Sequence, residues 1–441
     1  MEITPLDSWI QKKIGCSELT REAINHYQLK QLNQTIALAR EKSNYYRQKL
    51  NQLNTFPLKQ LSDITNLPIT PSDDLKRNPY DFLCVSQSEI SRVVSLQSSG
   101  TTGTSKRIYF TAADQQLTID FFHHGMSTLV APGDRVLIML PGERPGSVGD
   151  LLKKALARFE VTAVLHGPLQ DVNGTLEILH RESINSIVGI PVQVLALARS
   201  SEIMQPLQLK SVLLSTDYVP ATIVQELQRI WQCQVYNHYG MTEMGLGGGV
   251  ECAARNGYHL READLYFEII DPDSGQPVAP GEVGEVAFTT LTRVGMPLIR
   301  YATGDMARFI PERCPCGSVL LRMGKVTGRL TNVVTLAPNQ QLTMSQLDEI
   351  IFTIKEIVDF RVNITAAGEV TKLNLEVKTL PGSNVQRTKG LIRELLLKVT
   401  PVANAIASGT LQLGTVNFIE TNWISNGTIK RTFNDLREGD K

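Results

Sequence analysis

Short apolar runs alternate with helical patterns through the middle of the chain, and this alternation most restricts the possible fold. The apolar runs lie at 135–140, 162–167, 186–191 and 211–216. Between them, the segments 149–159 and 221–232 carry apolar residues at helical spacing. Strands that alternate with helices are typical of α/β domains with mainly parallel sheets, because each parallel connection needs a crossover. The sequence therefore predicts an α/β domain, preceded by a helix over 29–50.

The pattern changes after about residue 260. Short strand-like segments separated by Asp, Pro and Gly predict a β-rich subdomain over about 260–328. Past Gly328, helical patterns at 344–356 and 385–399 accompany period-two segments typical of strands. These segments lie at 359–365, 372–378 and 415–420. We therefore expect a large N-terminal domain over 1–328 and a small α+β domain over 329–441.

The charge balance argues against two classes of partner. The 44 Lys and Arg residues equal the 44 Asp and Glu residues in number, so no net field favours nucleic acid or an anionic membrane. No apolar run reaches the length of about 18 residues that a membrane-spanning helix needs. The first residues lack the apolar core of a signal peptide, so we expect a cytoplasmic protein with reduced cysteines.

One polar run has the composition of a phosphate-binding loop. It reads Ser-Ser-Gly-Thr-Thr-Gly-Thr-Ser-Lys and follows a strand-like segment. Glycines let backbone N–H groups turn towards an anion, hydroxyls donate further hydrogen bonds, and lysine adds a positive charge. The spacing does not fit the Walker pattern, and an ordinary polar surface loop explains the composition equally well. The candidate phosphate-binding residues are Ser98, Ser99, Gly100, Thr101, Thr102, Gly103 and Lys106.

This run resembles the phosphate loop of the adenylate-forming superfamily, which includes acyl- and aryl-CoA ligases. Ser105 replaces the usual proline, and Lys106 stands at the lysine position of the family. Three further segments, Ser215–Tyr218, Tyr239–Glu243 and Tyr301–Asp305, match family motifs in the right order. The residues before the loop and the segment around 250–308 look like the phenylacetate–coenzyme A ligase branch.

The resemblance implies a role for each motif. Tyr239 would stack on adenine, Thr242 would bond the α-phosphate and Glu243 would hold Mg²⁺. Asp305 would accept hydrogen bonds from both ribose hydroxyls. The same resemblance adds Thr216, Asp217, Tyr218, Gly240, Met241 and Arg329 to the nucleotide site.

The C-terminal region departs from the family pattern. Relatives carry Gly-Arg-x-Asp-Asp at the hinge of a mobile lid, whereas the run from Gly328 to Asn332 keeps Arg329 and lacks both acids. The catalytic lysine of relatives is replaced by Thr428, and Lys430 lies two residues further on, on the same face of a strand. We rank Lys430 first as its substitute, and whether it can replace that lysine stays open at this point.

Three cysteines and a histidine have the composition of a structural zinc site. Cys252 and His259 are followed by Cys314-Pro315-Cys316, and three thiolates with one imidazole form a closed tetrahedral set. Some members of the phenylacetate branch resemble this chain in carrying metal at such a set. Unrelated buried thiols are the alternative, because Cys-x-Cys is tighter than the usual zinc spacing.

Together these motifs predict an acid–thiol ligase that uses ATP and Mg²⁺. A substrate carboxylate would attack the α-phosphate, and the acyl group would then pass to coenzyme A. The resemblance to the phenylacetate–coenzyme A ligase branch implies an aromatic acid. Lys430, Lys106, Thr242 and Glu243 would carry the chemistry. Transfer to a different acceptor and a nucleotide-binding regulator without ligase activity are the alternatives. We expect small-molecule partners, no nucleic acid and no membrane, and a homodimer is compatible with the sequence.

Overall fold

The computed structural model describes residues 2–51, 56–96, 105–204, 206–330, 332–368, 370–419 and 430–437. The chain forms two compact units, and each unit is assembled from three separate segments of the sequence. Unit 1 comprises residues 1–134, 141–165 and 236–326, and unit 2 comprises 135–140, 166–235 and 327–441. The last segment of unit 2 therefore begins at Thr327. The expected division into domains over 1–328 and 329–441 stays a prediction.

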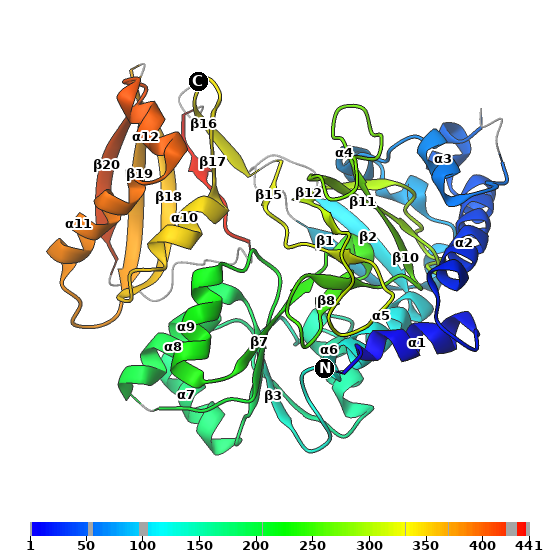
Figure 1. Cartoon of the computed structure of the whole chain (residues 1–441), viewed down its shortest axis with the longest axis horizontal. Helices are drawn as coiled ribbons and strands as arrows, with labels where there is room; N and C mark the ends of the chain where they lie inside the picture. Colours follow the sequence, from blue (N-terminus) through cyan, green and yellow to red (C-terminus); the bar gives the residue numbers. More distant parts are fainter. Residues whose placement is uncertain are drawn as a thin grey trace. The chain divides into compact units, whose positions relative to one another are not determined.

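Unit 1 begins with helices, as the sequence predicts. The expected helix over 29–50 is interrupted at Ser43, whose side chain accepts a hydrogen bond from the Tyr46 N–H and so caps a new helix. In Figure 1 these helices lie at the blue end of the chain. They are α1 (Pro5–Ile14), α2 (Arg21–Lys42), α3 (Asn44–Lys49) and the short α4 (Ser72–Arg77).

A β-hairpin leads into the central helix of unit 1. Strand β1 (Ile90–Leu96) pairs antiparallel with β2 (Lys106–Thr111), and Leu96 lies opposite Lys106. Helix α5 (Ala112–Met126) starts directly after β2, where Thr111 and Asp114 form a reciprocal capping box. Helix α6 (Val148–Ala157) and strand β4 (Thr162–Leu165) also belong to this unit.

The predicted β-rich subdomain is an antiparallel sheet. Strands β10 (Leu265–Ile270), β11 (Gly284–Thr290) and β12 (Tyr301–Ala307) are adjacent in that order. A second antiparallel run follows the order β13, β14, β9, β8, β7. Its members are β7 (Gln234–Tyr239), β8 (Gly249–Glu251), β9 (Tyr258–Leu260), β13 (Phe309–Ile310) and β14 (Arg322–Met323).

The parallel strands predicted from the apolar runs form the sheet of unit 2. Strand β5 (Ser186–Gly189) pairs in parallel with both β3 (Arg135–Ile138) and β6 (Ser211–Leu214). Residues of these strands are almost all buried, which explains their continuous apolar character. The accompanying helices are α7 (Val172–Arg181), α8 (Pro191–Met204) and α9 (Ala221–Trp231).

The C-terminal part of unit 2 is α+β, as expected. Long strands β18 (Ile357–Ala367) and β19 (Val370–Thr379) pair antiparallel, and β20 (Leu411–Phe418) adds in parallel. The expected helix over 344–356 ends early because its last residues turn into β18. The remaining elements are β15 (Gly328–Arg329), β16 (Val333–Ala337), β17 (Gln340–Thr343), α10 (Met344–Ile351), α11 (Val385–Leu396), α12 (Thr400–Ala407) and β21 (Asn434–Asp435).

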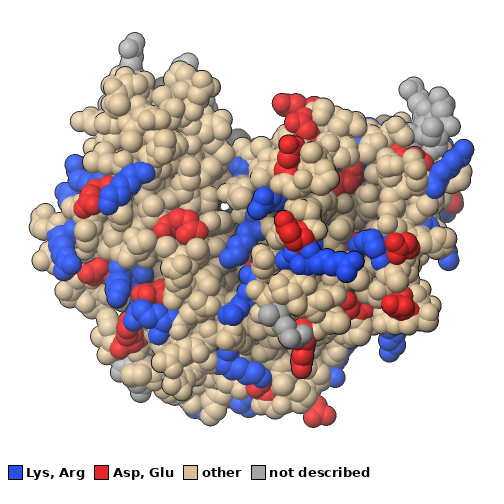
Figure 2. All heavy atoms as spheres, in the orientation of Figure 1, with Lys and Arg blue, Asp and Glu red and all other residues tan. Residues whose placement is uncertain are grey.

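Two surface properties bear on the expected partners. None of the helices that the structure describes is long and apolar enough to cross a membrane. On the face shown in Figure 2, basic and acidic side chains are interspersed. This distribution agrees with the balanced composition of the chain.

Candidate active site

The predicted phosphate loop connects the two strands of the β1–β2 hairpin. Residues Ser98 to Gly103 lie outside the described part of the chain, so their predicted role rests on the sequence. Lys106 is described and is the first residue of β2. The hairpin therefore fixes the backbone of the predicted phosphate-binding lysine.

The side chain of Lys106 contacts the predicted magnesium ligand. Its Nζ donates hydrogen bonds to Glu243 Oε1 at 2.6 Å, to Ser72 Oγ at 2.7 Å and to the Tyr301 hydroxyl at 2.8 Å. The Tyr301 hydroxyl also donates to Glu243 Oε1 at 3.2 Å. The Glu243 carboxylate therefore binds a cation, the Lys106 ammonium, in this structure. Carboxylate oxygens are also the hard ligands that Mg²⁺ prefers. Glu243 fits the predicted metal role.

Ser72 and Tyr301 contact Lys106, although the sequence analysis assigns neither a role. Tyr301 is the first residue of the Tyr301–Asp305 motif, in which the resemblance implies a role only for Asp305. Ser72 lies in α4, and no spacing rule connects it with Lys106, 34 residues away. The polar Pro-Ser-Asp-Asp run before the loop, which forms the start of α4, was the available signal.

The predicted adenine and ribose residues are also adjacent. The Tyr239 hydroxyl donates to Asp305 Oδ2 at 3.1 Å, joining the end of β7 to β12. The Gly304 N–H donates to Glu285 Oε1 at 2.7 Å, and Gly304 has a φ of 77°. Burial, together with the charge of Asp305, raises the pKa of Glu285. These contacts fix the irregular part of β12 that presents Asp305, where the register with β11 shifts.

Glycine is required where the Tyr239–Glu243 segment turns. A Cβ at Gly240 would lie 2.5 Å from the Leu246 carbonyl oxygen, closer than a real Cβ approaches such an atom. Thr242 and Glu243 then form a single 3₁₀ turn, which ends at Gly245 with a φ of 74°. Met241 precedes this turn, and Glu243 is buried at its centre. The turn sets the carboxylate against Lys106.

In unit 2, the predicted adenine turn contacts the C-terminal segment. Asp217 Oδ2 accepts a hydrogen bond from the Arg431 N–H at 2.9 Å, and the Tyr218 hydroxyl donates to Glu349 Oε1 at 2.7 Å. Thr216 has a φ of 77°, a strained value for a residue with a β-branched side chain. Lys430, the proposed catalytic lysine, is exposed and directly precedes Arg431.

Arg431 lies among three carboxylates. Its Nε donates to Asp348 Oδ1 at 3.0 Å, its Nη1 donates to Asp359 Oδ1, and its Nη2 donates to the Phe360 carbonyl at 3.0 Å. Burial raises the pKa of Asp217, of Asp359 and of Asp348, the last to about 7, and Arg431 opposes each rise. Sequence analysis assigned Arg431 no role because its partners lie far apart in the chain.

The structure does not test the predicted roles of Thr428 and Arg329. Thr428 lies outside the described residues. Arg329 lies in β15 and is half-buried, and its predicted role in nucleotide binding stays a prediction.

The four predicted zinc ligands are brought together by the fold of unit 1. Their ligand atoms all lie within 4.8 Å of one another, and all four residues are buried. Cys252 Sγ is 3.6 Å from Cys314 Sγ, and Cys316 Sγ is 3.4 Å from His259 Nε2. A tetrahedral zinc ion with Zn–S bonds of about 2.3 Å requires S–S separations of about 3.8 Å. The donor set therefore fits zinc in both chemistry and spacing.

The comparisons with known proteins agree on one family. Residues 71–291, half of the chain, match the family of AMP-binding enzymes. The chain is 28% identical over 375 residues to the phenylacetate–coenzyme A ligase of Thermus thermophilus, covering 82% of each chain. It is 26% identical over 379 residues to the Escherichia coli phenylacetate–coenzyme A ligase, covering 80% of this chain and 81% of that one.

Solved structures show the same fold. A 2-hydroxyisobutyryl-CoA ligase in the postadenylation state, in complex with R3-HIB-AMP, superposes with a TM-score of 0.76 at 20% identity. That match covers 95% of this chain and 89% of the ligase. The same ligase in the thioesterification state, in complex with 2-HIB-AMP and CoA, has a TM-score of 0.66 at 20% identity and covers 95% of this chain and 91% of the ligase.

Proposed function

Because the chain belongs to the AMP-binding enzyme family, we propose that it activates a carboxylic acid with ATP and transfers the acyl group to coenzyme A. The contact between Lys106 and Glu243 carries the proposal, since it joins the predicted phosphate lysine to the predicted magnesium ligand at 2.6 Å. The Tyr239–Asp305 contact adds the predicted adenine and ribose positions within the same unit. The curated relatives that match over 80% of the chain are phenylacetate–coenzyme A ligases, so an aromatic acid is the first substrate class to test.

The proposed reaction has two steps. A substrate carboxylate oxygen attacks the α-phosphorus of ATP, and the bond to the bridging oxygen of the leaving pyrophosphate breaks. The thiol sulfur of coenzyme A then attacks the acyl carbon, its proton is lost, and AMP leaves with the electron pair of the acyl–oxygen bond.

The residues of this chain would bind and orient the nucleotide. Tyr239 offers a flat face for adenine and Asp305 offers two acceptor oxygens for the ribose diol. The ammonium of Lys106 would offset phosphate charge, and the Thr242 hydroxyl would donate to the α-phosphate. Mg²⁺ bound at Glu243 would supply further neutralisation of phosphate charge. Lys430 would provide the cation between the substrate carboxylate and the α-phosphate.

Pyrophosphate exchange tests the first step. The purified chain should exchange labelled pyrophosphate into ATP in the presence of one or more acids from a library led by arylacetates and benzoates. Adding coenzyme A should then yield a thioester, identified by mass spectrometry. Exchange without a thioester would favour another acceptor, such as an amine, and nucleotide binding without exchange would favour a regulator.

We also propose that Cys252, His259, Cys314 and Cys316 hold a structural zinc ion. The 3.6 Å sulfur–sulfur separation supports this assignment, because it suits two thiolates on one metal and greatly exceeds the about 2 Å of a disulfide bond. Bound zinc would fix the loops that carry these residues and would take no part in the reaction. Metal analysis of protein purified without added zinc should find one equivalent.

The lid, the cellular location and the oligomeric state are further predictions. We propose that residues 329–441 form a lid that rotates between the two steps, with the boundary where the chain enters β15. A cytoplasmic location and a homodimer are compatible with this function and are tested by fractionation and by light scattering.

A further inference from the structure

Arg293 is a buried arginine that links two predicted parts of the nucleotide site. Its side chain is in unit 1 and Arg293 is only 6% exposed. Its Nη1 donates to the Glu243 carbonyl oxygen at 2.8 Å, and its Nη2 donates to the Tyr109 carbonyl oxygen at 2.8 Å. Tyr109 is in β2, three residues after Lys106. One guanidinium therefore holds the backbones that carry Lys106 and Glu243.

An aromatic ring and two carboxylates lie near this guanidinium. It lies over the Phe110 ring, 4.5 Å from the ring centroid, and donates to carbonyls. Its Nε is buried without a hydrogen-bond partner among the described residues. Burial lowers the pKa of Arg293, while the nearby charges of Asp114 and Glu243 raise it. Burying a charge is costly unless nearby groups compensate it, and here Asp114 and the predicted metal ligand Glu243 are those groups.

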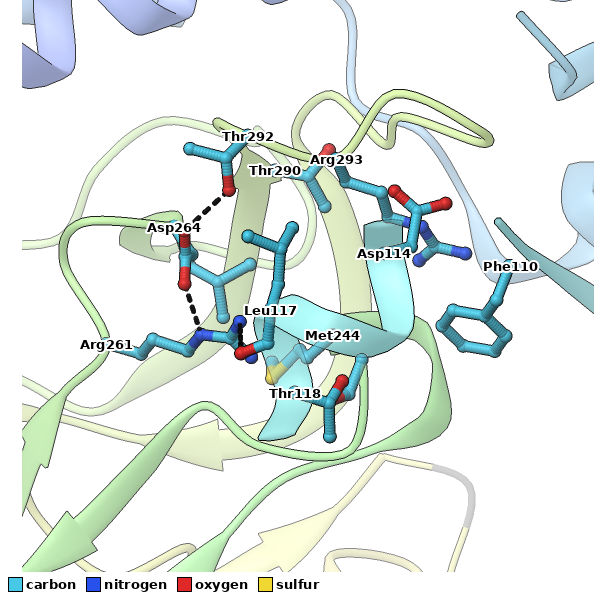
Figure 3. Close-up of a pocket in the computed structure, with 12 residues that line it drawn as sticks. Phe110, Asp114, Leu117, Thr118, Met244, Arg261, Asp264, Thr290, Thr292 and Arg293 are labelled. Atoms are coloured by element: carbon cyan, nitrogen blue, oxygen red, sulfur yellow. Dashed lines mark hydrogen bonds and ion pairs between the residues drawn. The ribbon is translucent and has the colours of Figure 1, made fainter. Parts of the chain in front are cut away.

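The segment that carries Arg293 is itself fixed in place. Asp114 Oδ1 accepts a hydrogen bond from the Val294 N–H at 3.1 Å, and Oδ2 accepts one from the Thr111 N–H at 2.9 Å. A Cβ at Gly295 would lie 2.5 Å from Asp114 Oδ2, so this close approach requires glycine. Figure 3 shows Arg293 beside Asp114 and Phe110, across the pocket from Arg261.

We propose that Arg293 is a positioning residue that holds Glu243 and Lys106 in the geometry required to bind Mg²⁺ and ATP. The inference rests on the proposed function, which assigns those two residues to the metal and the phosphates. The planar fork of arginine reaches two carbonyls at once, which the single ammonium of lysine cannot do in the same geometry. Loss of the fork would let the turn at Glu243 move relative to β2.

The test compares metal-dependent and metal-independent nucleotide binding. In Arg293→Gln, calorimetry should show Mg²⁺-dependent ATP binding weakened about 10- to 100-fold, the usual effect of removing a group that orients a metal ligand. AMP binding without Mg²⁺ should change less than about threefold, because stacking on Tyr239 and the bonds to Asp305 remain. Arg293→Lys should fall between the parent and Arg293→Gln.

Arg261→Gln is the matched control. Arg261 is also buried and lines the same pocket, but its described hydrogen bonds go to Asp264 at 2.7 Å and to the carbonyls of Gly247 and Leu117. This variant should lower thermal stability while leaving the ratio of the two nucleotide affinities unchanged.

Two results would overturn the inference. One is an Arg293→Gln protein whose Mg²⁺-dependent and Mg²⁺-independent affinities both stay at the parent level, and the other is an equal loss of both. If Arg293→Gln does not fold, Gly295→Ala displaces Asp114 and should produce the same selective loss, and an unselective effect there also counts against it. A parent protein that binds no ATP would refute the proposed function itself, which separates the two failures.

Discussion

Replacement of Arg431 by methionine keeps an unbranched side chain about as long as the aliphatic part of arginine but removes the guanidinium that faces Asp348 and Asp359. In the parent, hydrogen bonds join Arg431 to both carboxylates and to the Phe360 carbonyl. Breaking a buried ion pair by removing one partner costs about 3–5 kcal/mol, because the remaining charges stay buried. We expect a loss of this size in the stability of the C-terminal part of unit 2.

The loss should depend on pH in a defined direction. Burial raises the pKa of Asp348 from its ordinary 3.8 to about 7, so its protonated form stabilises the fold, and this contribution is lost as the pH rises through 7. Burial also raises the pKa of Asp359, and Arg431 opposes that rise, so removing Arg431 should raise the pKa of Asp359 further. Both carboxylates should then bind a proton more tightly in the folded protein than in the unfolded chain, so the variant should lose stability relative to the parent as the pH rises from 6 to 8. The variant should therefore be closest to the parent at pH 6.

Hydrogen exchange followed by mass spectrometry measures this effect locally. Amides of α10 and β18, which carry Asp348 and Asp359, should exchange faster in Arg431→Met, and more so at pH 8 than at pH 6 after correction for intrinsic rates. Arg361→Met is the matched control, since Arg361 pairs with Glu376 at 3.4 Å on the surface and should change stability by less than about 1 kcal/mol. Equal protection in the two variants, or a larger loss at pH 6, would refute the reasoning.

Three further predictions concern the nucleotide, the catalytic lysine and the metal. Asp305→Ala should weaken AMP binding by about 1.5–3 kcal/mol per lost hydrogen bond, whereas exposed Asp273→Ala should not, as calorimetry can show. Lys430→Ala should reduce pyrophosphate exchange about 100- to 1000-fold if Lys430 supplies the cation, and a large gain from Thr428→Lys would instead mark the natural protein as a weakened ligase. Cys316→Ser should purify with much less than one zinc while Cys16→Ser retains it, and metal analysis that finds no zinc in the parent contradicts the zinc site.

Local patterns were enough to predict much of the fold. The continuous apolar runs at 135–140, 186–191 and 211–216 became the parallel strands β3, β5 and β6, because strands buried on both faces need apolar residues throughout. Helix boundaries were less accurate. The helix over 29–50 breaks at Ser43, since an N-cap hydrogen bond there competes with helix continuation, and nothing in the apolar period signals it.

For the candidate site, too, the sequence predicted the residues and the fold decided which of them are in contact. Motif order predicted Lys106, Tyr239, Glu243 and Asp305. In the fold, Lys106 contacts Glu243 and Tyr239 contacts Asp305. The zinc set was predicted from residue type, spacing and the family resemblance. Its members converge in unit 1, where β9, which carries His259, pairs with β14, the strand that follows Cys314 and Cys316.

The sequence by itself determined which residues can do chemistry, because residue type and short spacing encode charge, donors and local turns. Only the tertiary structure decided which of them meet. Lys106 and Glu243 are 137 residues apart in the chain, and Arg431 lies 83 residues from Asp348. Arg293 reaches Tyr109 across 184 residues. Such pairings depend on how strands and helices pack around a shared core, and a residue's own neighbours in sequence carry no record of that packing.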